Sequence, residues 1–187
     1  MPDAEWWSAL WPDPTGVLAA AGLAQDTDAI DLCSGDGWFT APMAAIARRV
    51  TAIDIDANLL EQSRVRLAEQ GVANCDFILG DAYDIAKLVQ RKVDFVFLAN
   101  AFHGVPDQTR LARAVREALA PGGRFAIVNW HQRPREETTV LGQPRGPKTQ
   151  LRMSPNQTVT AVAGAALALD KIVELPPYHY GAIFVRA

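Results

Sequence analysis

The stretch from Ala29 to Thr40 constrains the fold of this chain more than any other. It begins with an apolar run, turns through Gly35-Asp-Gly37, and opens a helical pattern at Ala41. A strand, a glycine turn and a helix in this order place backbone N–H groups at the start of the helix, where they face a ligand. Glycines suit such a turn because a Cβ atom would hold the ligand away from the backbone. The stretch therefore predicts a ligand-binding turn, although Gly-x-Gly alone is also compatible with a merely tight turn.

A second apolar run ends in a carboxylate. Val50-Thr-Ala-Ile-Asp54 reads as a buried strand whose last residue follows Gly35 by about 20 residues, the spacing at which an acid in a βαβ nucleotide site accepts hydrogen bonds from ribose hydroxyls. Thr40 occupies the position of the third glycine of the dinucleotide pattern. This departure argues against NAD, and the acid inside the first strand, Asp31, indicates a different ligand.

Five motifs carry a resemblance to a known family. They are Asp31-Leu-Cys-Ser-Gly-Asp-Gly37, Ala52-Ile-Asp54, Cys75-Asp-Phe-Ile-Leu-Gly-Asp-Ala82, Val93-Asp-Phe-Val-Phe-Leu-Ala-Asn100 and Leu119-Ala-Pro-Gly-Gly-Arg-Phe-Ala-Ile-Val128. In order and spacing they resemble the motifs of class I S-adenosylmethionine-dependent methyltransferases, over about residues 28–130. The plain departure is Cys33, which replaces the first glycine of the first motif, and a small residue should still fit there.

Apolar strands alternate with helical patterns along the chain, which predicts a parallel sheet with helices on both faces. The resemblance implies a single-domain, doubly wound α/β fold with a mostly parallel seven-stranded sheet whose last strand runs antiparallel. The expected parts are an N-terminal helical lid or flank (1–27), a cofactor-binding core (28–130), a basic loop (131–153), and a final helix with a strand pair (154–187). Helices are expected over Ala57–Glu69 and Thr109–Ala120, and a strand over Val93–Ala99. Ser154 as N-cap and Pro155 as the first helical residue indicate where the last helix begins.

The resemblance also implies roles for individual residues toward S-adenosyl-L-methionine. Asp31 and the Gly35/Gly37 turn would hold the methionine end of the cofactor, with Cys33 beside them, and Asn100 would lie next to the amino-acid part. Toward the other end, Asp54 would bind the ribose hydroxyls, Ile55 would pack on adenine, and Asp81 and Ala82 would contact the adenine edge.

Three tryptophans, Trp6, Trp7 and Trp11, lie ahead of the first strand in two short predicted helices. Each can bury up to about 250 Å², so one interpretation is that they fasten this segment to the sheet. The other is a lid with an indole face near the cofactor's sulfonium, an attraction of about 0.5–2 kcal/mol when desolvated. The resemblance supports the lid, since the segment before the core often covers the ligand in this family. Trp11 is the candidate cofactor contact.

Histidines are the candidate general bases, because an imidazole has a pKa near neutrality. His103 follows the fourth strand and Trp130-His131 ends the fifth, so both histidines are expected at the ligand edge of the sheet and are the catalytic candidates. His179, beside Tyr178, begins the final strand, and this pair is a candidate for acceptor binding. A structural role remains the alternative for each histidine. Methyl transfer also proceeds by alignment alone, without a base.

The loop after Trp130 is rich in Gly, Pro and basic residues. A solvated surface loop is one interpretation. The other is that Arg133, Arg145 and Arg152 bind an anionic acceptor through bidentate contacts. With no apolar periodicity, the loop is expected to have little core of its own and to be mobile in the empty enzyme.

Composition bounds the function. The chain has 187 residues, 49% of them hydrophobic, and a formal net charge of −3, so no basic field attracts nucleic acid or an anionic membrane. Two cysteines without a spaced pattern indicate neither a disulfide framework nor a metal site. No signal peptide is recognised, which favours a cytoplasmic protein. We expect a methyltransferase for a small-molecule acceptor, with an anionic acceptor as one reading. An RNA or protein methyltransferase acting with a partner, and a non-catalytic cofactor-binding module, stay open as alternatives, as does the oligomeric state.

Overall fold

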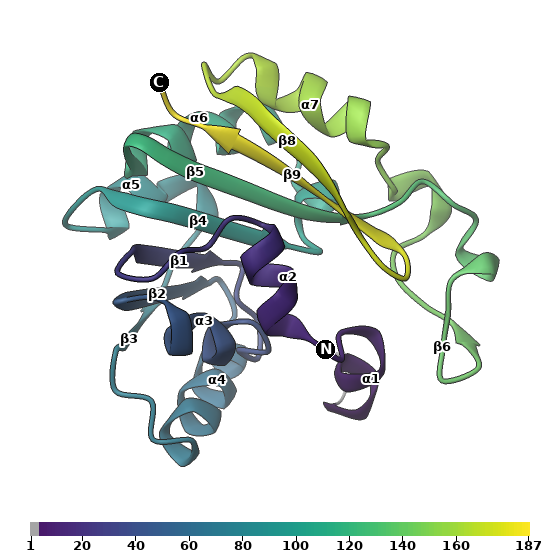
Figure 1. The fold of residues 1–187 in the computed structure, drawn as a ribbon, viewed down its shortest axis with the longest axis horizontal. Coiled ribbons are helices and arrows are strands. Elements are labelled where there is room, and N and C mark those ends of the chain that lie inside the picture. The colour runs from purple at the N-terminus through teal and green to yellow at the C-terminus, as the bar shows by residue number, and fades with distance from the viewer. Residues whose placement is uncertain (1–3) are drawn as a thin grey trace.

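The computed structural model describes residues 4–187 as a seven-stranded sheet with helices on both faces (Figure 1). The strand order is β3-β2-β1-β4-β5-β9-β8. The strands are β1 (Asp28–Leu32), β2 (Arg49–Asp54), β3 (Cys75–Leu79), β4 (Val93–Ala99), β5 (Leu119–Trp130), β8 (Ala168–Leu175) and β9 (His179–Val185). All neighbours pair in parallel except β9, which runs antiparallel to both β5 and β8. The expected fold class is confirmed.

The described residues contain seven α-helices: α1 (Ala4–Leu10), α2 (Pro14–Ala20), α3 (Thr40–Ile46), α4 (Ala57–Glu69), α5 (Ile85–Leu88), α6 (Gln108–Ala118) and α7 (Pro155–Ala163). The bounds of α4 match the prediction: Asp56 caps its first turn through Asn58 N and Leu59 N, and Gly71 follows it at φ 72°. The helix predicted over Thr109–Ala120 ends earlier, because Leu119 already pairs with Val93 as part of β5.

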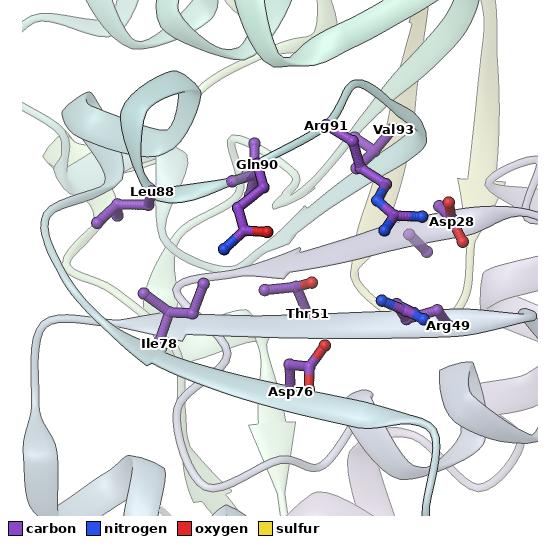
Figure 2. Close-up of a pocket in the computed structure, with 11 residues that line it drawn as sticks. Asp28, Arg49, Thr51, Asp76, Ile78, Leu88, Gln90, Arg91 and Val93 are labelled. Carbon is purple, nitrogen blue, oxygen red and sulfur yellow. The ribbon is translucent and has the colours of Figure 1, made fainter.

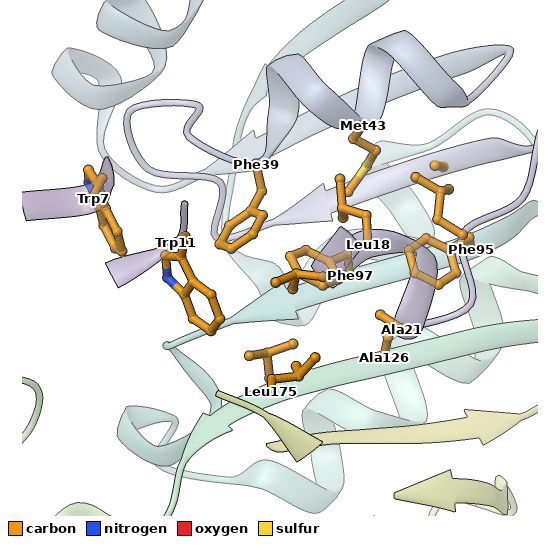
Figure 3. Close-up of a cluster of buried hydrophobic side chains, with 14 of the residues drawn as sticks. Trp7, Trp11, Leu18, Ala21, Phe39, Met43, Phe95, Phe97, Ala126 and Leu175 are labelled. Atoms are coloured by element: carbon orange, nitrogen blue, oxygen red, sulfur yellow. The ribbon is translucent and has the colours of Figure 1, made fainter. Parts of the chain in front are cut away.

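Two apolar cores lie on opposite faces of the sheet. One joins α1, α2 and α3 to β1, β4 and β5, and Figure 3 shows its central side chains, with Trp11 and Phe39 beside Phe97. The other joins α5, α6 and α7 to the strand residues of opposite parity, such as Ile30 and Val96. Alternation of side chains along each strand produces this division, since both faces of a parallel sheet are covered.

The N-terminal segment forms the two short helices that the sequence predicts. Trp6, Trp7 and Trp11 are all buried, with 7%, 7% and 1% of their surface exposed. Asp13 separates the helices and caps α2 by accepting a hydrogen bond from Gly16 N at 2.8 Å. Figure 1 shows α1 at the edge of the molecule, set apart from the helices that flank the sheet.

The basic segment has a core, contrary to the expectation from its composition. It forms a small hairpin of β6 (Thr139–Val140) and β7 (Gln143–Pro144), and α1 contacts β6. Arg152 is only 2% exposed and donates hydrogen bonds to Thr138 Oγ1 and to the carbonyl of Arg145. Its guanidinium also lies over the Trp130 ring at 5.0 Å. A buried arginine, rather than apolar periodicity, organises this segment.

The final helix begins as predicted. Ser154 caps α7 and forms a reciprocal capping box with Gln157, with Pro155 as the first helical residue. Among residues 4–187, no helix combines the length and the apolar character needed to cross a membrane.

Candidate functional site

Three cavities lie where β1, β2 and β4 end, and they share lining residues. We name them the Asp81 cavity, the Asp31 cavity and the tryptophan cavity, with volumes of about 390, 40 and 400 Å³. Cys33, directly after β1, lines all three. Because ligands of open parallel sheets bind off the carboxyl ends of the strands, this connected space is the candidate site.

The Asp31 cavity contains a buried carboxyl group. Asp31 is 3% exposed, and its Oδ2 accepts a hydrogen bond from Thr40 Oγ1 at 2.6 Å. Burial raises the pKa of Asp31 to about 7, the Thr40 hydrogen bond lowers it, and the charges of Asp54 and Asp36 raise it further. Thr40, which breaks the dinucleotide pattern, thus has a defined partner here. A cation bound beside Asp31 would stabilise its ionised form.

Asp54 holds the glycine turn in place. Its Oδ2 accepts a hydrogen bond from Gly35 N at 2.8 Å, and its Oδ1 accepts one from Asp56 N at 2.9 Å. It also lines both the Asp81 cavity and the tryptophan cavity. The carboxylate therefore ties the loop after β1 to the end of β2, and it faces the candidate site at the same time.

Gly37 has a packing task. It adopts φ 81°, and a Cβ atom there would lie 2.2 Å from Ser63 Oγ and 3.2 Å from Ser63 Cα, on α4. The missing side chain allows α4 to approach the turn. Within residues 4–187, Gly37 lines none of the three cavities, so the close approach of α4 is a second reason for this glycine, and its contact with the cofactor stays a prediction.

Two residues with positive φ point to strain at the ends of β1 and β4. Cys33 has φ 58° and Asn100 has φ 59°, a conformation uncommon for residues other than glycine. Burial raises the pKa of the Cys33 thiol to about 12, helped by the charges of Asp54 and Asp31. Asn100 lines the Asp31 and tryptophan cavities, and its Oδ1 is buried without a hydrogen-bond partner in residues 4–187. Such backbone strain is typical of ligand sites.

The Asp81 cavity combines an exposed apolar side chain with a fixed acid. Ile55 is 73% exposed directly after β2, and it lines this cavity together with Ala82. Asp81 lines the cavity too, and its Oδ1 accepts a hydrogen bond from Tyr83 N at 2.9 Å. A large aliphatic side chain left in solvent beside a cavity marks a surface for a flat apolar group.

The tryptophan cavity is bordered by three indoles, from Trp6, Trp7 and Trp130, and by His103. Trp7 lies edge-on to Trp6 at 4.7 Å and stacks on Trp38 at 6.3 Å. Burial lowers the pKa of His103, and a polar interaction with the Asn129 side chain partly opposes this. His103 is therefore a neutral imidazole at pH 7 beside an aromatic cavity.

Several predicted site residues lie elsewhere. Within the described part of the chain, none of the three cavities is lined by Trp11, His131, Arg133, Arg145, Arg152, Tyr178 or His179. His131 pairs with Glu174, its Nε2 lying 2.8 Å from Oε2. Tyr178 donates a hydrogen bond to the carbonyl of Thr139 and stacks on Trp130 at 5.9 Å.

Trp11 and His179 are both buried, each 1% exposed. The rings of Trp11 and Trp130 lie 4.3 Å and 4.2 Å from the His179 ring. Burial, followed by the charges of His131, Arg152 and His103, holds the pKa of His179 well below its ordinary value. These contacts give His179 a packing role, behind Trp130 rather than in the cavity.

Of the three N-terminal tryptophans, Trp6 and Trp7 line the tryptophan cavity, whereas the candidate cofactor contact expected from the sequence is Trp11. All three indoles have the same chemistry and lie within one short segment, so only the direction of each side chain separates them. Helical spacing was the available signal: Trp7 and Trp11 are four residues apart, and Trp6 precedes them. That spacing does not distinguish which neighbour faces a cavity.

A fourth hollow, of about 310 Å³, opens at the opposite ends of the strands. Figure 2 shows Arg49 and Arg91 reaching toward it, with Asp28 and Asp76 on either side. It borders the residues that begin β1, β2 and β3 rather than those that follow their carboxyl ends. Its position sets it apart from the candidate site.

Comparison with known proteins agrees with this geometry. Residues 29–123, about half of the chain, match the family model described as a methyltransferase domain. The chain belongs to the class I S-adenosylmethionine-dependent methyltransferases. The matched region of this methyltransferase runs from β1 to the turn inside β5, so it includes Asp31, Cys33, Asp54, Asn100 and His103.

Curated relatives of this methyltransferase match only in part. Methyltransferase gedG of Aspergillus terreus is 32% identical over 100 residues, 54% of this chain and 30% of that protein. A ubiquinone biosynthesis O-methyltransferase of Xanthomonas axonopodis pv. citri is 30% identical over 138 residues, 69% of this chain and 57% of that protein. The chain thus spans between about a third and three fifths of the length of these relatives.

One solved structure covers nearly the whole methyltransferase. The crystal structure of a SAM-dependent methyltransferase from Aquifex aeolicus superposes with a TM-score of 0.82, over 99% of this chain and 94% of that one, at 18% identity. At this identity the similarity demonstrates the fold. It extends beyond the matched family region to the N-terminal helices and to the strands after β5.

Proposed function

We propose that this methyltransferase transfers the methyl group of S-adenosyl-L-methionine to a small, flat, uncharged acceptor bound in the tryptophan cavity. The observation that carries the proposal is the connection between the three cavities at Cys33. This connection supports a cofactor bound in one space and an acceptor bound in a separate aromatic space, on either side of Cys33. When bound, the cofactor supplies a methyl carbon already activated by the positive charge on sulfur.

The residues around the cavities fit this cofactor. The unpaired Oδ1 of Asn100 and the buried carboxyl of Asp31 suit a cationic methionine end. Asp54 retains free lone pairs for ribose hydroxyls beside its two backbone bonds, since an ionised carboxylate accepts about four hydrogen bonds. Exposed Ile55 suits an adenine face. Gly35 contributes to the wall, and Asp81 and Ala82 form the rim near the adenine position.

The lining of the tryptophan cavity supports an uncharged acceptor. Among the described residues that line it, none is Lys or Arg, and Asp54 would repel an anion. The indoles of Trp6, Trp7 and Trp130 offer flat apolar walls, on which aromatic rings stack favourably. The anionic acceptor expected from Arg133, Arg145 and Arg152 finds no support in this lining. A planar ring with a hydroxyl group fits both the walls and His103.

The name of one relative favours oxygen as the acceptor atom. The Xanthomonas protein is named as an O-methyltransferase of ubiquinone biosynthesis, and transfer to a hydroxyl group benefits from a base of near-neutral pKa. His103 borders the acceptor space and is neutral at pH 7, since burial lowers its pKa. We assign the base role to His103 rather than to His131, which pairs with Glu174.

The test is an assay with radiolabelled methyl donor against separate panels of hydroxylated aromatic compounds, aromatic carboxylates, RNA and protein. We expect the label in the first panel. His103→Gln should lower kcat about 10²-fold, in the range for loss of a general base, whereas His131→Gln serves as the matched histidine control and should have little effect. Labelling of RNA or protein alone, or equal losses in the two variants, would contradict the proposal.

A further inference from the structure

A buried hydrogen-bond chain joins two strands and one helix, and it begins at Asn129, a residue that interacts with His103. Asn129 on β5 donates through Nδ2 to Thr158 Oγ1 on α7, with 3.2 Å between the atoms. Thr158 Oγ1 lies 2.6 Å from the hydroxyl of Tyr180 on β9. Tyr180 in turn donates to the carbonyl oxygen of Met153 at 3.0 Å. The side chains of Asn129, Thr158 and Tyr180 belong to residues with no exposed surface.

The Met153 carbonyl at the end of this hydrogen-bond chain determines which group donates and which accepts at each step. A carbonyl oxygen accepts and cannot donate, so Tyr180 must use its single hydroxyl hydrogen on Met153. Thr158 must then donate its own hydrogen to Tyr180. With that hydrogen used, Thr158 can only accept from Asn129, so the amide nitrogen of Asn129, and not its oxygen, faces Thr158. The hydrogen bonds of Thr158 and Tyr180 therefore set the orientation of the Asn129 amide, and this orientation does not depend on His103.

At the Asn129 end of the hydrogen-bond chain, one buried acceptor atom and one buried ring nitrogen have no hydrogen-bond partner among residues 4–187. Oδ1 of Asn129 and Nδ1 of His103 are both buried, and neither has a close hydrogen-bond partner among residues 4–187. The two side chains nevertheless interact, since Asn129 raises the pKa of His103 against the larger effect of burial. One of the two unpaired atoms is an acceptor oxygen and the other is a ring nitrogen that can carry a hydrogen, so each is a candidate partner for the other. A buried unpaired polar atom is costly, which favours their pairing.

We propose that Asn129, Thr158 and Tyr180 are positioning residues that hold His103 in the Nδ1–H tautomer, leaving Nε2 as the proton acceptor for the tryptophan cavity. This rests on the proposed function, in which His103 is the base. The acceptor hydroxyl gives its proton to Nε2 while its oxygen lone pair forms the new bond to the methyl carbon, and the electron pair of the broken carbon–sulfur bond stays on sulfur. The resulting imidazolium keeps its Nδ1–H on Asn129 Oδ1.

The tautomer can be measured without any turnover. The chain contains three histidines, so His103→Gln and His131→Gln assign all ring signals in ¹⁵N-resolved spectra of the ¹⁵N-histidine-labelled protein. We expect His103 to be neutral with Nδ1 protonated. Tyr180→Phe removes the hydroxyl that fixes the direction of the chain, and Asn129→Leu removes the acceptor. Each should shift the tautomer ratio of His103 by about 10-fold toward Nε2–H, the effect expected for one buried hydrogen bond.

Tyr178→Phe is the matched control for the spectra, because that hydroxyl donates to Thr139 outside the chain and its loss should leave the His103 tautomer unchanged. An Nε2–H tautomer in the wild type, or the same shift in the Tyr178 variant, would overturn the inference even in an active enzyme.

Kinetics provide a second test once an acceptor is known. Tyr180→Phe should lower kcat about 10-fold with an unchanged KM for the methyl donor, and an unchanged kcat counts against the inference. Failure to find any acceptor while the tautomer behaves as expected would contradict the proposed function alone.

Discussion

The carboxylate of Asp54 connects the stability of the glycine turn to the chemistry of the site. Its position at the end of a strand could be predicted from the sequence, as could its place at the edge of the sheet where the cavities lie. Its hydrogen bond to Gly35 N could not, because that bond depends on β1 and β2 lying side by side in the register that pairs Leu32 with Ile53.

Replacing Asp54 with Ala should therefore affect both folding and binding. The backbone N–H of Gly35 would be left buried without an acceptor, which costs about 1–3 kcal/mol of the free energy of unfolding. Loss of the ribose contact should weaken cofactor binding by about 1.5–3 kcal/mol. Urea unfolding and calorimetry measure the two effects separately. An unchanged unfolding free energy would mean that the turn does not depend on Asp54.

Asp31 should make cofactor binding depend on pH. In the empty folded protein its pKa is raised to about 7, from 3.8 for the ordinary group. Between these values the folded state holds a proton that the unfolded chain releases. The contribution of Asp31 to stability is therefore largest below pH 3.8 and falls by up to about 1.4 kcal/mol per pH unit until about pH 7.

A cation bound beside Asp31 favours its ionised form, so cofactor affinity should rise with pH, by up to about tenfold per unit, and level off above about pH 7. Calorimetric titrations from pH 5.5 to 8.5 check this. Asp31→Asn keeps an acceptor for Thr40 but cannot ionise, so its affinity should be weaker and flat over this range. A wild-type profile as flat as that of the variant would place the cationic end of the cofactor elsewhere.

At the scale of elements, α1 covers the candidate site while part of it belongs to the core. Trp7 lines the Asp31 and tryptophan cavities, and Trp11 packs against Phe39 and His179. Of the two interpretations offered by the sequence, fastening describes Trp11, and a lid stays a prediction for Trp7. The contact of α1 with β6 brings the N-terminal helix and the basic segment together beside the tryptophan cavity.

Paired Trp→Leu variants separate these tasks. Trp7→Leu should raise the KM for the acceptor about 10-fold, because a stacking wall is lost. Trp11→Leu should lower the free energy of unfolding by about 1–3 kcal/mol, since it removes packing from the core, with a smaller change in KM. Steady-state kinetics and thermal unfolding of both proteins provide the comparison. Equal effects on KM would show that α1 acts on the site only through its stability.

Elements with strong periodicity and clear end signals were predictable. The helix α4 and the strand β4 have the bounds that the sequence indicates, and Ser154 and Pro155 mark the start of α7. The basic segment was not predictable in this way, because its order depends on Arg152 lying over Trp130. A buried arginine bound to backbone carbonyls has the same sequence signal as an exposed one.

At the scale of the whole molecule, the tryptophan cavity draws its walls from distant parts of the chain. Trp7 comes from α1, His103 from the segment after β4, Trp130 from the end of β5, and Pro147 from the basic segment. Parallel strands bring their carboxyl ends to one edge, so the rule for strand ends predicted His103 and Trp130. The contributions of α1 and of the basic segment depend on tertiary packing and carry no local pattern.

Ligand-dependent melting tests the molecule as a unit. A ligand that binds only the folded state at 100 times its dissociation constant stabilises it by about 2.7 kcal/mol, which for a chain of this size corresponds to a rise in Tm of about 5–11 °C. S-adenosylmethionine and its demethylated product should both produce this shift, because in the proposed site their binding would join α1, β1, β2 and β4 around one ligand. NAD should produce none, since Thr40 replaces the third glycine of the dinucleotide pattern and bonds to Asp31 instead. The Asp54→Ala protein is the control, with a lower starting Tm and a smaller ligand shift. A larger shift with NAD than with the methyl donor would contradict the assignment of the cavities at the carboxyl edge of the sheet.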